Sequence, residues 1–127
     1  MRAIIILLLT ALLAACATAP TPEQLEDQQR REALRETALA KMDRFLRERV
    51  VLLDQAGREE SLDVLILVDG AVTPRLREHM DGYRVEVRAV SGSLLNARIP
   101  SSQAVPFASQ AYVVRMELPG DVVPPSR

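Results

Sequence analysis

Residues 62–68 read LDVLILV, an apolar run that predicts the first strand of a small domain. The segment TPRLREHMDG at residues 73–82 then places a Thr-Pro cap before Leu76 and Met80, which share one face of a helix, and a glycine after them. YRVEVRA at residues 83–89 alternates apolar and charged side chains, which is typical of a strand with one buried face. The opening order is therefore strand, helix, strand.

The next part of the chain repeats this alternation in two further strands. A Ser-Gly-Ser turn at residues 91–93 precedes LNARI at residues 95–99, in which the apolar residues share one face. Residues 101–110 predict a helix that one of its first two serines caps. Residues 112–118 read YVVRMEL and predict a closing strand whose buried side includes Val114.

The resulting order over residues 61–118 predicts an α+β domain of the ferredoxin-like βαββαβ kind, with helices on one face of a four-stranded antiparallel sheet. YRVEV at residues 83–87, the Ser-Gly turn and ARIP at residues 97–100 also resemble the propeptide or inhibitor domain of subtilisin-like proteases. This resemblance implies docking onto a protease by the open sheet face, with the tail at residues 119–127 approaching its cleft. Pro106 departs from the usual second helix of that family.

The amino-terminal segment has the parts of a secretory signal in order: a positive start, an apolar run and small residues. As a helix the apolar run would span about 20 Å, short of the roughly 30 Å hydrocarbon core of a bilayer. Leu13-Ala14-Ala15-Cys16 resembles the lipobox of bacterial lipoproteins, which implies that residues 1–15 are a signal peptide cleaved between Ala15 and Cys16. The alternative is a free cysteine at the end of an ordinary secretory signal.

The lipobox resemblance also implies where the mature protein resides. In that family the cysteine and the new amino terminus are both acylated, with palmitate-type chains, and three chains hold a protein firmly in a bilayer. Ala17 stands where an Asp commonly favours retention in the inner membrane, so we expect an outer-membrane protein that faces the periplasm. The expected partner of Cys16 is thus the lipid bilayer.

A tether and one long helix are expected between the lipid and the domain. Residues 16–22 are small and contain proline, which suits an extended spacer. Residues 23–57 contain no proline and no glycine before Gly57, so they predict a single charged and amphipathic helix, and its apolar spacing sharpens over residues 39–53. A coiled-coil arm, a membrane-surface helix and a domain helix with a charged stalk are the alternatives. Residues 119–127 are expected to form a flexible tail.

Two leucines stand on the side of the first strand where an exposed face would carry polar residues. This strand is central in a ferredoxin-like sheet, so Leu65 and Leu67 form an apolar stripe on a face that is otherwise charged. We expect the apolar face of the long helix to cover the stripe, and a partner protein is the alternative. The candidate partner-binding face consists of Leu65, Leu67, Arg84, Arg88, Arg98 and Arg115.

The composition supplies little for catalysis or metal binding. The chain has one His, His79, and one Cys, Cys16, which the lipid is expected to occupy. We therefore expect no catalytic residue, no metal site and no cofactor besides the lipid, since an enzyme would need a pocket that joins His79 to at least two carboxylates. The net charge of −1 and the scarcity of aromatic residues argue against nucleic-acid binding.

These patterns together predict a membrane-anchored periplasmic lipoprotein whose small domain binds a partner, such as an envelope protein, or serves as a structural element. The first alternative is a protease inhibitor or chaperone that docks by its sheet face, and the second is a minor enzyme. A bare sheet face favours docking, whereas a helix seated on that face disfavours it.

Overall fold

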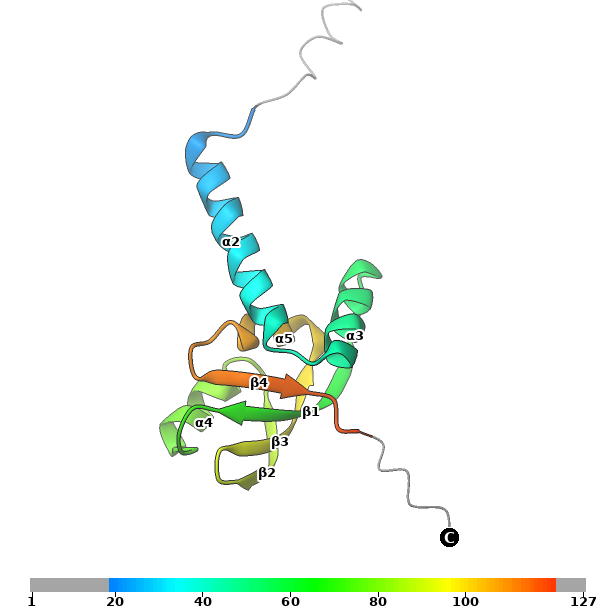
Figure 1. Ribbon diagram of the computed structural model, residues 1–127, viewed down its shortest axis with the longest axis vertical. Coiled ribbons are helices and arrows are strands. Elements are labelled where there is room, and N and C mark those ends of the chain that lie inside the picture. Colours follow the sequence, from blue (N-terminus) through cyan, green and yellow to red (C-terminus); the bar gives the residue numbers. More distant parts are fainter. Residues whose placement is uncertain (1–18, 121–127) are drawn as a thin grey trace, which may run out of the picture. The chain divides into compact units, whose positions relative to one another are not determined.

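The computed structural model describes residues 19–120 of the chain, which form an α+β fold (Figure 1). The predicted signal peptide at residues 1–15 and the lipid attachment site Cys16 lie outside the described residues, as do residues 121–127. The described residues contain four helices and a four-stranded antiparallel sheet. In chain order the elements are α2 (Pro22–Ala40), α3 (Arg44–Gln55), β1 (Ser61–Val68), α4 (Pro74–Asp81), β2 (Glu86–Ser91), β3 (Leu94–Pro100), α5 (Ser101–Ala108) and β4 (Val113–Glu117).

The start of α2 carries the capping box that the sequence predicts. The chain divides into two compact units, residues 1–30 and 31–127, and the first of them includes this start. The Thr21 N–H donates to the side-chain oxygen of Gln24 at 3.0 Å, and the Gln24 N–H donates to the Thr21 hydroxyl oxygen at 3.3 Å. This reciprocal pair satisfies two N–H groups that have no partner within the helix.

The single helix predicted over residues 23–57 is wrong, because the chain forms two helices, α2 and α3. The Asp43 carboxylate accepts from the Leu46 N–H at 3.1 Å and so caps α3. The backbone beside it pairs with β4: Met116 N–H donates to the Lys41 carbonyl at 2.8 Å, and Asp43 N–H donates to the Met116 carbonyl at 2.9 Å. Pairing with a strand far along the chain therefore ends α2, although no glycine or proline is present there.

The sheet has the strand order β2-β3-β1-β4, with β1 and β3 at its centre (Figure 1). Its neighbouring strands are all antiparallel. The register of β4 shifts against Leu67 and Val68, so that Val113 and Met116 are buried while Val114 is 48% exposed. The prediction that Val114 faces the core is wrong, because this β-bulge adds one residue to β4 and moves its alternation.

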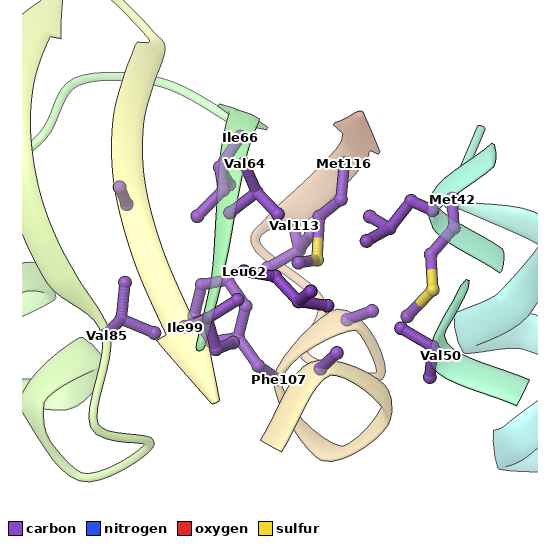
Figure 2. Close-up of a cluster of buried hydrophobic side chains, with 14 of the residues drawn as sticks. Met42, Val50, Leu62, Val64, Ile66, Val85, Ile99, Phe107, Val113 and Met116 are labelled. Carbon is purple, nitrogen blue, oxygen red and sulfur yellow. The ribbon is translucent and has the colours of Figure 1, made fainter. Parts of the chain in front are cut away.

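The helices and one side of the sheet enclose a single apolar core. Figure 2 shows Phe107 of α5 among Leu62 of β1 and Ile99 of β3, and Val50 of α3 belongs to the same cluster. Met80 of α4 completes the helical contribution and is fully buried. Each such side chain contributes about 1.5–3 kcal/mol when it leaves water, so this core accounts for much of the domain's stability.

Candidate functional site

The sheet has a second face, which we call the open face. Along β1 the side chains of Val64 and Ile66 are buried, whereas the alternate residues Leu65 and Leu67 are partly exposed. The strand register then identifies the outward neighbours of these leucines. The open face includes Asp63, Leu65, Leu67, Glu86, Ala89, Ser91, Leu94, Asn96, Arg98, Arg115 and Glu117. Arg88, at the bulge of β2, joins it through its ion pair with Asp63.

An apolar hollow of about 270 Å³ lies on the open face. Leu67 pairs with Leu94 of β3 and with Arg115 of β4, and Leu65 pairs with Glu117. Leu67 is 37% exposed and Leu94 is 43% exposed. All five side chains line the hollow, so the predicted stripe is present and is wider than predicted. The sequence signal for the additional leucine is its position just before Leu95, because neighbouring strand residues point to opposite faces.

The helix that was expected to cover these leucines packs against the other face. Leu46, Val50 and Leu53 of α3 are buried in the same core cluster as the inward residues of β1. The expectation that this helix covers Leu65 and Leu67 is therefore wrong. The apolar periodicity predicts correctly which residues of the helix are buried, but it does not indicate against which side of the sheet the helix packs.

One end of the open face carries a network of ion pairs. Arg98 donates two hydrogen bonds to the Asp63 carboxylate, at 3.0 and 3.2 Å, and a nitrogen of Arg88 lies 3.6 Å from the same carboxylate. Arg88 also lies 4.0 Å from Glu86. The hydrogen bond from Arg98 lowers the pKa of Asp63 and raises the pKa of Arg98 itself. These contacts favour the ionised form of Asp63 and link its strand, β1, to Arg98 of β3 and Arg88 of β2.

The charges of the open face balance one another. At the rim of the hollow Arg115 forms an ion pair with Glu117. The three carboxylates of Asp63, Glu86 and Glu117 thus match the three guanidinium groups of Arg88, Arg98 and Arg115. Because the pairs are exposed, they add little to stability. They leave an apolar patch at the other end of the face, bordered by the Arg115–Glu117 pair.

Arg84, a predicted member of this face, lies elsewhere. After α4 the Val85 N–H donates to the Met80 carbonyl at 3.3 Å and Arg84 takes a φ of 56°, which is the left-handed end of a Schellman turn. Its guanidinium group donates to Glu59 at 3.2 and 3.3 Å and to Ser102 at 3.4 Å. The prediction is wrong because the helix ends with this extra turn, so that β2 begins only at Glu86.

His79 lies in a different hollow, of about 330 Å³, beside α4. Its ring stacks on Tyr83 with centroids 5.8 Å apart and meets the edge of Tyr112 at 5.4 Å. The residues that line this hollow are Thr73, Arg75, Leu76, His79, Gln110, Ala111 and Tyr112, none of which is an Asp or Glu. The hollow therefore does not bring to His79 the carboxylates that the enzyme alternative requires.

Among residues 19–120, no three His, Cys, Asp or Glu side chains are grouped so that they could hold a metal ion. No helix in this described part of the chain is long and apolar enough to cross a membrane. The chain matches no protein-family model, no curated protein and no solved structure in the comparisons. Its function is therefore inferred from its own residues and their geometry.

Proposed function

We propose that the protein is a bacterial lipoprotein that is anchored to the outer membrane and faces the periplasm. The lipobox Leu13-Ala14-Ala15-Cys16 supports this proposal, since it predicts removal of residues 1–15 and attachment of lipid to the only cysteine. Three acyl chains, each stabilised by about 0.8 kcal/mol per buried CH₂, would keep the mature protein at its membrane. The lipid is the only cofactor in this proposal.

The domain at residues 61–118 is, in this proposal, a ferredoxin-like module without catalytic activity. Two observations support the ferredoxin-like class: the element order β1-α4-β2-β3-α5-β4 and the strand order β2-β3-β1-β4. The absence of carboxylates from the lining of the His79 hollow supports a binding role over an enzymatic one.

The module binds a protein partner through the open face. The observation that carries this proposal is the hollow formed by Leu65, Leu67 and Leu94, on the face opposite the core against which α3, α4 and α5 pack. The occupant is an apolar side chain of the partner, because the charges around the hollow are mutually paired and select no net charge. Covering the exposed parts of Leu67 and Leu94, 37% and 43% of these residues, would contribute about 1–2 kcal/mol.

The anchoring part is tested with Cys16→Ser. We expect the wild-type chain to gain the mass of the lipid, to lose residues 1–15 and to remain with the membrane pellet. The variant should lose all three properties, and globomycin should block processing of the wild type. A Cys16→Ser chain that still pellets with membranes, or an unmodified thiol in the native protein, would contradict the anchor.

The docking part is tested with a photo-crosslinking amino acid in place of Leu67. Leu52 of α3 is the matched control position, since it is 60% exposed and lies outside the hollow. We expect one envelope protein to crosslink at position 67 and not at position 52, and the adduct to disappear in a Leu94→Arg background. Once identified, that protein should bind the purified chain with an affinity that Leu94→Arg lowers at least about tenfold. Equal adducts at both positions, or adducts only to lipid or a second copy, would overturn the proposal.

A second candidate function, a protease inhibitor or chaperone, is favoured by the same bare face. The domain resembles the propeptide of subtilisin-like proteases, which implies docking by the open sheet face. We expect the full chain in detergent micelles to inhibit a purified subtilisin, Leu67→Arg to abolish inhibition, and Leu52→Arg to leave it unchanged. Absence of inhibition at micromolar concentration, or equal effects of the two variants, would remove this candidate.

A further inference from the structure

The His79 hollow is independent of the open face. It lies between α4 and the segment that joins α5 to β4, and it shares no lining residue with the apolar hollow. Its volume of about 330 Å³ reaches the range of sites that hold small molecules. What it could bind therefore follows from its own walls and charges.

Aromatic rings form one wall of this hollow, and they support one another. The His79 ring meets Tyr112 nearly perpendicularly, at 86°, and its other neighbour is Tyr83 at an interplanar angle of 28°. Behind them, Phe107 lies 5.6 Å from Tyr83 and 6.0 Å from Tyr112, between ring centroids. Because Phe107 is fully buried, this wall is attached to the core and is formed before any ligand arrives. Leu76 adds an apolar surface beside it.

The charged lining of the hollow has one sign. Arg75 lies in the first turn of α4, two residues after the cap residue Thr73, where the helix dipole also favours an anion. No carboxylate lines the hollow, and Arg75 forms no ion pair with any residue from 19 to 120.

A larger hollow between α3 and α5 differs from the His79 hollow in the pairing of its arginines. Its volume is about 420 Å³, and it too is lined by arginines. There Arg35 is paired with Asp54 and Arg58 with Glu60, each at 3.0 Å. Those guanidinium groups are engaged within the protein, whereas Arg75 is available to a ligand.

We propose that the His79 hollow binds a small aromatic carboxylate. The guanidinium group of Arg75 would pair with the carboxylate, a geometry that arginine forms with two parallel hydrogen bonds. The ring of the ligand would lie against the wall of His79 and Tyr112, with Leu76 beneath it. The site requires both groups together, since neither an exposed arginine nor a ring wall binds strongly alone.

The probe is N-acetyl-L-phenylalanine, compared with N-acetyl-L-phenylalaninamide, which keeps the ring and lacks the charge. Each is titrated into the ¹⁵N-labelled full chain in detergent micelles and followed by NMR. We expect the acid to cause saturable shifts at Leu76, His79 and Ala111, and to bind about five- to tenfold more tightly than the amide. Arg75→Gln should weaken the acid by a similar factor. Arg77→Gln is the matched control on the same helix and should change the affinity less than about twofold, because Arg77 does not line the hollow.

Three results would overturn this site. The first is the absence of saturation by the acid at about 10 mM. The second is equal affinity for the acid and the amide, which would mean that the ring alone binds and that Arg75 does not recognise the carboxylate. The third is an equal loss of affinity in Arg75→Gln and Arg77→Gln, which would indicate a diffuse charge effect. Unchanged shifts of the core amides of Leu95 and Ala97 verify that each variant is folded.

Discussion

The two faces of the sheet both carry apolar residues of β1, but they differ in how far these residues are buried. On β1, Val64 and Ile66 have no exposed surface, whereas the next residue in the alternation, Leu67, is 37% exposed. The helices α3, α4 and α5 all contribute to the buried side, and the open face keeps a leucine-lined hollow. The fold therefore buries apolar residues on only one side of β1 and leaves the leucines on its other side partly exposed.

The largest expected effect separates these two faces by stability. Phe107→Ala removes a fully buried ring from the covered face and should lower the free energy of unfolding by about 3–5 kcal/mol. Leu67→Ala should change it by less than about 1 kcal/mol, because its side chain is already partly in water. Urea denaturation of both variants measures the difference. A loss at Leu67 as large as that at Phe107 would mean that the open face belongs to the core of the folded chain.

The next effect concerns the edge where the two faces meet beside β4. The Asp43 carboxylate accepts from the Leu46 N–H at 3.1 Å and from the Leu118 N–H at 3.3 Å, so it joins the start of α3 to the end of β4. Asp43→Ala should destabilise the protein by about 1–2 kcal/mol. Asp43→Asn is the control and should retain most of the stability, since asparagine caps helices comparably well. Equal losses in both variants would show that charge, and not capping, holds this edge.

How far the fold could be predicted depends on the range of the interactions. The alternation at residues 95–99 predicted β3 correctly, with Leu95, Ala97 and Ile99 buried, because the signal lies within the strand itself. The end of α2 could not be predicted in this way, because it depends on pairing between Lys41 and Met116, which lie far apart in the sequence. The hydrogen bond from the Leu118 N–H to Asp43 likewise joins residues 75 positions apart.

The candidate site divides in the same manner. Leu65 and Leu67 were found because apolar residues on both sides of a strand are visible locally. Arg84 was misplaced because a left-handed residue after a helix gives no simple signal when it is not glycine. The sequence did not show whether a helix covers the open face, since this depends on the side of the sheet against which α3 packs. Sequence periodicity thus indicates that a surface is apolar, while tertiary packing decides whether it is covered.

A smaller stabilising effect is expected at Tyr112, at the margin of the covered face. Its hydroxyl oxygen is buried and has no hydrogen-bond partner among the described residues. Tyr112→Phe removes this unpaired group and keeps the ring, so it should raise the free energy of unfolding by about 1 kcal/mol. Tyr83→Phe removes a hydroxyl from the neighbouring ring and is the matched control. A destabilised Tyr112→Phe would mean that the hydroxyl has a partner.

Tyr112 should also make the stability of the protein depend on pH in the alkaline range. Burial raises the pKa of Tyr112 to about 12, from an ordinary value of 10.0, so the folded state favours the neutral phenol. This contribution to stability is complete below pH 10 and is lost as the pH rises toward the folded pKa, because the unfolded chain releases the proton first. Thermal melts between about pH 9 and pH 11 should therefore show a steeper decline for wild type than for Tyr112→Phe. Parallel declines would contradict the raised pKa.

The smallest expected effect lies in the ion pairs of the open face. The hydrogen bond from Arg98 lowers the pKa of Asp63 below its ordinary value of 3.8, so the folded state favours the carboxylate. The associated stability is present above the ordinary pKa and is lost as the pH falls through the folded pKa, because the unfolded chain takes up the proton first. Asp63→Asn should therefore slightly flatten the fall of stability at acid pH. Asp69→Asn is the control, because Asp69 forms no ion pair with another described residue. Because both partners are exposed, salt should weaken the effect further. A large loss of stability in Asp63→Asn at neutral pH would show that this rim supports the fold, and the contrast between the two faces would then have to be confined to the leucines.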